Sequence, residues 1–163
     1  MSQLHDNLQR EDLPEIPHSL YRADQVRELD RLAIEQEGIP GLELMERAGA
    51  AAFTLLRHRW PRGKMIGVLC GTGNNGGDGF VLARLAHQAG YDVCVWQLGE
   101  SEPGSSASSA REAMEAAGLH AKVFDRDAFS AQEILVDGLL GTGLHEEVKS
   151  QWREARHKTR PPT

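Results

Sequence analysis

The run Gly71-Thr-Gly-Asn-Asn-Gly-Gly-Asp-Gly79 carries the clearest chemical signal in the sequence. It follows a short apolar pattern typical of a strand at 65–70 and precedes a helical pattern at 80–89. A glycine-rich turn between a strand and a helix aims free backbone N–H groups and the positive helix end at a phosphate. Glycine lets the backbone approach such a ligand closely. The run therefore predicts a nucleotide-phosphate loop, although its G-x-G-x-x-G pattern alone is a weak signal.

Three polar side chains stand within this loop. Asn74 and Asn75 either tolerate a left-handed turn or contact a ligand, and two in succession favour contact with a ligand. Asp78 is expected near the start of the following helix, where a carboxylate caps free N–H groups or faces a ligand.

A second glycine turn, Gly141-Thr-Gly143, follows an apolar run at 133–140 that contains Asp137. Burying a carboxylate in such a strand is costly unless the group is paired or binds a metal. Two interpretations of Asp137 stay open on chemistry alone. It accepts hydrogen bonds from nearby loop N–H groups, or it binds a hard cation together with the amide oxygen of Asn75.

The elements that position these loops follow from hydrophobic periodicity and from glycine and proline breaks. Two helices are expected first, from Asp24 to Gly38 and from Pro40 to just before Pro61. Their predicted inward residues are Val26, Leu29, Leu32 and Ala33 in the first helix and Leu42, Met45, Ala48, Ala52 and Leu55 in the second. Strands are then expected at 64–70, 92–98, 121–124 and 133–140, with helices at 79–89 and 108–117 between the first three. This alternation predicts an α/β fold with a parallel sheet.

The order of the strands explains why two distant loops should meet. In the common doubly wound order 3-2-1-4, the first and fourth strands are neighbours, and the direction of winding reverses between them. Ligands bind at this point, outside the carboxyl ends of the strands. The loops at 71–79 and 141–143 are therefore predicted to line one crevice.

Composition narrows the classes of function. The 163 residues fit one domain, and a net charge of −6 argues against a nucleic-acid partner. No apolar run has the length of a membrane span, and the first residues do not resemble a secretory signal. Cys70 and Cys94 are expected to be free thiols in strands, which fits a cytoplasmic location.

Taken together, Gly73-Asn-Asn-Gly-Gly-Asp-Gly79 and Val136-Asp-Gly-Leu-Leu-Gly-Thr-Gly143 resemble the NAD(P)H-hydrate epimerases, the YjeF N-terminal domain. The stretch from Ile39 to Gly49 is similar to the lead-in helix of that family. The resemblance implies a Rossmann-like three-layer αβα domain with a mostly parallel sheet, here incomplete after the fourth strand. The expected organisation is a polar lead-in at 1–18, the nucleotide-binding domain at 19–148 and an irregular tail at 149–163.

The resemblance also implies an activity, namely interconversion of the R and S forms of hydrated NADH and NADPH. It places one potassium ion per subunit at Asn75 and Asp137, and Asp78 and Asp137 are the candidate general acid/base residues. A functional link to an NAD(P)H-hydrate dehydratase and a homodimer are further expectations. The substrate-binding residues that it implies are Asn74, Asn75, Gly76, Gly77, Asp78, Gly141, Thr142, Gly143, Leu144, His145, Glu146 and Glu147.

The sequence departs from the family after the fourth strand. It lacks the Pro-Ser-Gly turn that supplies a further aspartate and potassium ligand, and Glu146 stands where the family usually has glycine. A C-terminally truncated enzyme is therefore expected. One alternative is a non-catalytic nucleotide-binding or scaffold module of the same fold. An NAD-dependent dehydrogenase ranks last, because it requires a helix that starts within 74–77 and a carboxylate at the end of the second strand.

Overall fold

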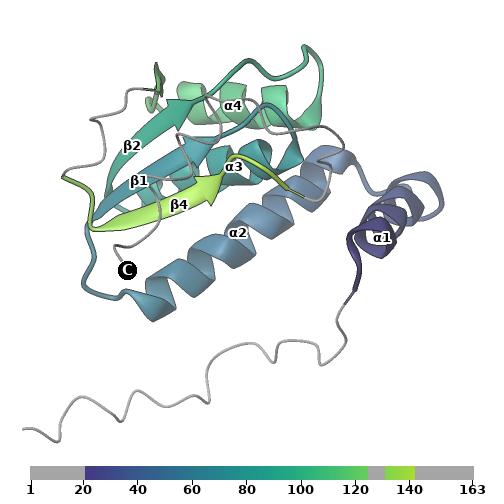
Figure 1. Cartoon of the computed structure of the whole chain (residues 1–163), viewed down its shortest axis with the longest axis horizontal. Coiled ribbons are helices and arrows are strands. Elements are labelled where there is room, and N and C mark those ends of the chain that lie inside the picture. The colour runs from purple at the N-terminus through teal and green to yellow at the C-terminus, as the bar shows by residue number, and fades with distance from the viewer. Residues whose placement is uncertain (1–20, 125–130, 142–163) are drawn as a thin grey trace, which may run out of the picture.

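The computed structural model describes residues 21–124 and 131–141. Within them, β1 (Met65–Cys70), β2 (Asp92–Gln97), β3 (Ala121–Val123) and β4 (Ile134–Gly138) form one sheet. All the pairings are parallel and the order is β3-β2-β1-β4 (Figure 1). The predicted 3-2-1-4 order is confirmed, and β1 and β4 are neighbours as the crevice requires.

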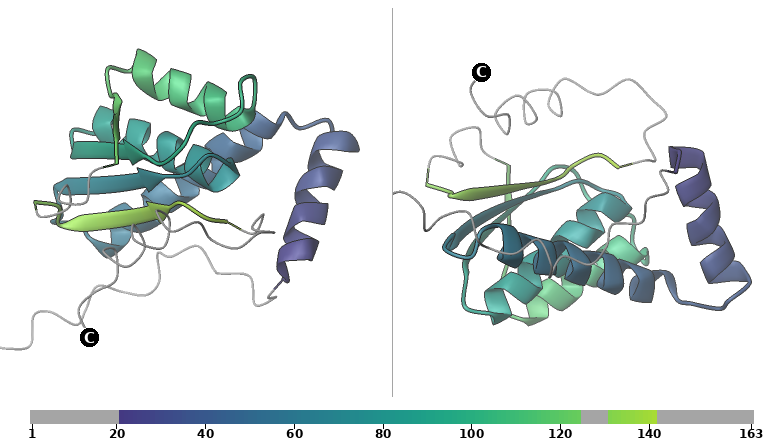
Figure 2. Two further views of the ribbon diagram at one scale, coloured as in Figure 1. Left: turned by 45° about the horizontal axis from the view of Figure 1, so that its top comes forward. Right: turned by 90° about the horizontal axis from the view of Figure 1, so that it is seen from below.

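Three helices cover one face of this sheet: α2 (Gly41–Arg59), α3 (Asn74–Gln88) and α4 (Ser106–Ala116) (Figure 2). The α/β class and the parallel sheet are confirmed. The third layer of the predicted αβα arrangement is not found among residues 21–124 and 131–141. The boundaries predicted at 18, 148 and 149 fall outside the described residues.

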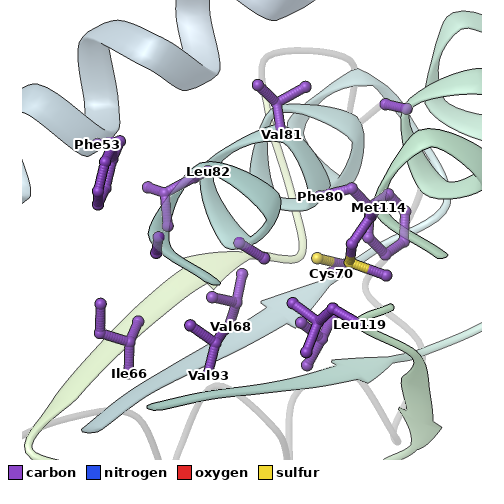
Figure 3. Close-up of a cluster of buried hydrophobic side chains, with 14 of the residues drawn as sticks. Phe53, Ile66, Val68, Cys70, Phe80, Val81, Leu82, Val93, Met114 and Leu119 are labelled. Carbon is purple, nitrogen blue, oxygen red and sulfur yellow. The ribbon is translucent and has the colours of Figure 1, made fainter. Parts of the chain in front are cut away.

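The main hydrophobic core lies between the sheet and these helices. Figure 3 shows Ile66 and Val68 of β1 beneath α3, with Phe80 and Met114 closing the core beside Cys70. A smaller cluster on the opposite face contains Leu69, Trp96, Leu98 and Leu139. Both faces of the central strand are therefore apolar, as expected for a parallel sheet.

The second helix buries a different face from the one predicted. Its buried residues are Met45, Gly49, Phe53 and Leu56, whereas Ala48, Ala52 and Leu55 are exposed. Gly49 sets this orientation, because a Cβ atom there would lie 2.5 Å from the Cβ of Val81 in α3. The run of small residues offers little contrast between faces, so close contact at the glycine decides which face is buried.

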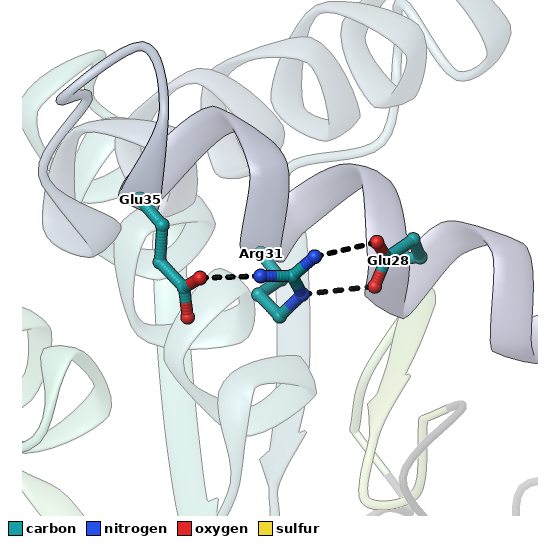
Figure 4. Close-up of polar contacts among 3 residues, drawn as sticks. All are labelled: Glu28, Arg31 and Glu35. Carbon is teal, nitrogen blue, oxygen red and sulfur yellow. Dashed lines mark hydrogen bonds and ion pairs between the residues drawn. The ribbon is translucent and has the colours of Figure 1, made fainter.

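The face predicted to point inward in the first helix is partly confirmed, because Val26, Leu32 and Ala33 are half-buried. This helix, α1 (Ala23–Glu35), buries none of its residues, and Leu29 is exposed. Figure 2 shows it standing apart from the sheet, close to the beginning of α2. Arg31 forms ion pairs with Glu28 and Glu35 along the exposed surface of α1 (Figure 4). Such i,i+3 and i,i+4 pairs support a solvated helix by a few tenths of a kcal/mol each.

The third helix begins at Asn74, five residues before the predicted start at 79. Asn-Asn-Gly-Gly is a poor helix start by propensity, but packing overrides that preference here. A Cβ atom on Gly76 would lie 2.1 Å from the carbonyl oxygen of Gly71, and one on Gly77 would lie 2.4 Å from the Sδ of Met45. The glycines therefore allow the first turn of α3 to pack against β1 and α2.

Candidate functional site

The loops that follow β1 and β4 meet at the carboxyl edge of the sheet. The N–H of Gly71 donates a hydrogen bond of 3.0 Å to the carbonyl oxygen of Gly138. The side chain of Asn75 spans the two loops, because its Nδ2 donates to the carbonyl oxygen of Leu140 at 3.2 Å. A Cβ atom on Gly141 would lie 3.1 Å from the Cβ of Asn75. The predicted convergence of the two loops is confirmed.

The beginning of α3 offers backbone donors that have no partner among the described residues. Its N-cap residue, Gly73, has no side chain to accept a hydrogen bond from the first turn. The first backbone bond of the turn runs from the N–H of Gly77 to the carbonyl oxygen of Gly73, at 3.1 Å. The N–H groups of the three preceding residues therefore point out of the helix, where the dipole also favours an anion. This geometry suits a phosphate group.

Both asparagines are part of this first turn. Asn74 is exposed and Asn75 is half-buried. Neither adopts a positive φ, so the left-handed-turn explanation for their presence is wrong. Because Nδ2 of Asn75 is used in the bond to Leu140, its Oδ1 is left to accept a hydrogen bond or to ligate a cation.

Asp78 lies in the second turn of α3, rather than at the cap position expected from the sequence. Its carbonyl oxygen would be 3.0 Å from a Cβ on Gly49, which places this part of α3 against α2. Burial raises the pKa of the Asp78 carboxyl to about 6, and the negative charge of Asp30 in α1 adds to the rise. A carboxyl with this pKa is populated in both protonation states near neutral pH, as a general acid/base needs to be.

Asp137 lies in β4 as predicted, but it is exposed rather than buried. Side chains alternate along a strand, so Asp137 points away from the face that contains Val136 and the helices. Its Oδ1 accepts a hydrogen bond of 3.1 Å from the N–H of Leu139. This bond is of the kind that the first interpretation of Asp137 requires, and cation binding by Asp137 stays a prediction.

The donors for a potassium ion are partly present. Asn75 Oδ1 and the Asp137 carboxylate are oxygen ligands of the kind that hard cations take. The described residues contain no cluster of three or more His, Cys, Asp or Glu side chains that could hold a metal ion. Binding of potassium at Asn75 and Asp137 therefore stays a prediction.

Six of the predicted substrate-binding residues lie outside the described residues, and their placement stays a prediction. They are Thr142, Gly143, Leu144, His145, Glu146 and Glu147. Gly141, the first residue of that turn, lies beside Asn75.

The carboxyl end of β2 belongs to the same edge. The N–H of Leu98 donates to the carbonyl oxygen of Cys70 at 3.0 Å, which ties the connection after β2 to the start of the glycine-rich loop. The last residue of β2, Gln97, is the buried polar residue of the described core. Gln97 was not among the predicted site residues; its place at the end of an apolar strand beside the loop was the available signal. The helix start at Asn74 fits the dehydrogenase alternative, but Gln97 is not the acidic residue that this alternative requires.

The cysteines do not contribute reactive groups to the site. Cys70 is a free and fully buried thiol, and burial raises its pKa, so it stays protonated. Cys94 is also free, but it is only partly buried.

In the described part of the chain, no helix combines the length and apolar character that a transmembrane span requires.

Comparison with known proteins agrees with this architecture. The chain is 48% identical over 134 residues to the bifunctional NAD(P)H-hydrate repair enzyme Nnr of Coxiella burnetii, covering 82% of this chain and 27% of that protein. It is 40% identical over 135 residues to the NAD(P)H-hydrate epimerase of Rhodopirellula baltica, covering 79% of this chain and 54% of that protein. The chain thus spans between about a quarter and about half of these two relatives.

The fold also matches that of a solved structure. The crystal structure of the yeast protein YNL200c superposes with a TM-score of 0.76 at 21% identity, covering 86% of this chain and 64% of that one. Residues 41–159 match the family described as YjeF-related protein N-terminus. This match includes both loops of the crevice and all the strands of the sheet. The chain belongs to the family of YjeF-related protein N-termini.

Proposed function

We propose that this chain binds hydrated NADH or NADPH and interconverts the R and S epimers of the hydrated ring. The observation that carries the proposal is the hydrogen bond from Asn75 to Leu140, which joins an uncapped helix N-terminus to the loop after β4. The uncapped N–H groups suit the phosphates of a nucleotide. The adjoining loop is then close enough to contact the rest of the same ligand.

The relatives support this substrate class. Proteins named NAD(P)H-hydrate epimerase from Rhodopirellula baltica and Rhodobacter capsulatus are each 40% identical to this chain over at least 134 residues. The Coxiella burnetii and Escherichia coli relatives are named bifunctional repair enzymes, at 48% and 39% identity. These names support an isomerase that works together with a dehydratase.

Epimerisation at a carbon that bears a hydroxyl group requires proton transfer or reversible loss of water. We assign Asp78 as the first candidate for the general acid/base, because its raised pKa lets it both hold and accept a proton near neutral pH. Asp137 is the second candidate, since its exposed carboxylate stands at the other loop. The substrate contacts we propose are the backbone N–H groups at 74–76 and the loop at 141–147.

Potassium is proposed to bind between Asn75 Oδ1 and Asp137. Its role would be to neutralise charge and fix the two loops, while the side chains of this chain hold the substrate. A homodimer and a cytoplasmic location remain predictions from the sequence.

The direct test is to supply the purified chain with the R epimer of hydrated NADPH and follow formation of the S epimer by chromatography. Spontaneous epimerisation without protein sets the baseline. Asp78→Asn should abolish the catalysed fraction, whereas Asp92→Asn, which alters an exposed carboxylate at the start of β2, should leave it unchanged. Conversion no faster than the baseline by the wild-type chain, together with ligand binding, would support the non-catalytic nucleotide-binding module instead.

The potassium site has a separate test. The melting temperature of the chain should be higher in potassium chloride than in choline chloride at equal ionic strength, because an ion that binds only the folded state stabilises it. Asn75→Ala should remove that difference. Equal melting temperatures for the wild-type chain in the two salts over a wide concentration range would refute a potassium site.

A further inference from the structure

Gln97 has a side chain that the fold leaves unsatisfied. It is 9% exposed, and its Nε2 is buried without a hydrogen-bond partner among residues 21–124 and 131–141. A buried donor without an acceptor destabilises a protein, so such groups usually have a water or ligand as partner. Core packing does not require an amide at this position, since an apolar side chain of similar size would fill the same space.

The position of Gln97 directs this amide toward the nucleotide site. Val93 and Val95 of β2 face the helices, so by strand alternation Gln97 also faces them. Its register partner in β1 is Cys70, the residue directly before the glycine-rich loop. The carboxamide therefore lies at the carboxyl edge of the sheet, beside the loop and on the same face as α3.

The surrounding elements approach one another closely at this edge. A Cβ atom on Gly77 would lie 3.1 Å from the Cα of Ala107, so the first turns of α3 and α4 are in contact. A Cβ atom on Gly99 would lie 2.6 Å from the Cγ2 of Thr72, so the connection after β2 packs on the glycine-rich loop. The same connection contains Ser101, whose Oγ is likewise buried and has no hydrogen-bond partner in the described part of the chain. The segment that flanks the proposed phosphate site therefore contains two buried polar groups, at Gln97 and Ser101, that lack a hydrogen-bond partner among the described residues.

We infer that Gln97 and Ser101 form a ribose subsite, in which their amide and hydroxyl bond the ribose of the nucleotide, directly or through one ordered water. This inference rests on the proposed function. Ribose carries adjacent hydroxyls that both donate and accept, which matches an amide and a hydroxyl. In related α/β folds the end of the second strand meets the ribose of a nucleotide whose phosphates lie at the first helix.

The subsite also determines specificity. A carboxylate at the end of β2 would accept from a free 2′-hydroxyl and repel a 2′-phosphate, whereas Gln97 is neutral and can donate to either. The chain should therefore bind hydrated NADH and hydrated NADPH with affinities within about tenfold of each other, because Gln97 itself carries no charge that opposes the additional phosphate.

The test compares Gln97→Met with Gln88→Met, which makes the same exchange at an exposed position at the other end of α3. The melting temperature of the free chain and the dissociation constants for hydrated NADH and hydrated NADPH are measured for each. Gln97→Met should melt at or above the wild-type temperature, because an unsatisfied donor is removed. It should bind both nucleotides about three- to tenfold more weakly, since one hydrogen bond is lost. Gln88→Met should change neither quantity.

Unchanged affinity in a folded Gln97→Met chain would overturn the subsite while leaving the proposed function intact. Ser101→Ala is a second test, needed if Gln97→Met fails to fold. Unchanged nucleotide affinity in Ser101→Ala would count equally against the subsite. Gln97→Glu should weaken binding of hydrated NADPH more than of hydrated NADH, and equal losses would contradict the ribose contact. Absence of nucleotide binding by the wild-type chain would instead refute the proposed function, and with it this inference.

Discussion

Replacing Asp78 by asparagine should make the chain more stable at neutral pH. Burial raises the pKa of this carboxyl from its ordinary 3.8 to about 6, so the folded state disfavours the charged form. At pH 7 the group is ionised in both states, and the folded state carries the full penalty. Asparagine has nearly the same shape and carries no charge, so it removes the penalty.

The magnitude follows from the rise in pKa. A change from 3.8 to about 6 corresponds to about 3 kcal/mol at full value. Asp78 is only half-buried, so solvent screening reduces this figure, and about 1–2 kcal/mol is the expected gain. The gain should be absent below about pH 4, where the carboxyl is protonated in both states, should grow between about pH 4 and 6, and should then stay constant.

Urea unfolding followed by tryptophan fluorescence measures this difference, because Trp96 is buried in β2. Wild type and Asp78→Asn are compared at matched pH, so that the other carboxyl groups cancel. Asp30→Asn removes the second cause of the raised pKa of Asp78. This variant should therefore also be more stable than wild type at neutral pH, by a smaller amount than Asp78→Asn. A stability difference that does not vary with pH, or a variant less stable than wild type at pH 7, would refute burial as the cause.

Further substitutions test the packing and the loop. Gly76→Ala should destabilise the fold by about 3 kcal/mol or more, because the new Cβ would lie 2.1 Å from a backbone oxygen, and calorimetry measures the loss. Gly73→Ala should cost less than about 1 kcal/mol in the same experiment, since its Cβ would meet no described atom within 4 Å. Phe53→Ala should cost about 3–5 kcal/mol and Leu55→Ala under about 0.5 kcal/mol in urea unfolding, and the reverse order would contradict the observed face of α2. Glu133→Gln should lower stability at pH 7 and lose that effect as the pH falls, because two backbone N–H groups lower the pKa of Glu133.

The sheet could be predicted from the sequence because its strands are short apolar runs bounded by glycines and polar residues. The order of the strands followed from the arrangement 3-2-1-4 that is common in doubly wound sheets. The two loops then had to meet, and the bonds from Gly71 to Gly138 at the end of β4 and from Asn75 to Leu140 show that they do. This part of the site was predictable because topology alone determines it.

The start of α3 and the buried face of α2 were not predictable from propensity. Both depend on contacts between residues distant in sequence, namely Gly76 with Gly71 and Gly49 with Val81. A glycine inside a helix is unfavourable by about 1 kcal/mol relative to alanine, so local rules place the helix boundary after it. Gln97 escaped notice for a related reason, since a polar residue at the end of an apolar run indicates only where the strand ends.

The glycines of the loop divide into those the fold requires and those it does not. Alanine cannot replace Gly76 without moving the backbone of Gly71, whereas at Gly77 it would meet the flexible end of Met45 and, less closely at 3.1 Å, the Cα of Ala107. At Gly73, with a φ of −101°, the described part of the chain gives no steric or conformational reason for glycine. A side chain there would, however, stand at the uncapped end of α3, where the proposed phosphate binds. If Gly73→Ala folds normally but binds the nucleotide weakly, the glycine serves the ligand; if binding is also unchanged, the phosphate does not approach this end of the helix.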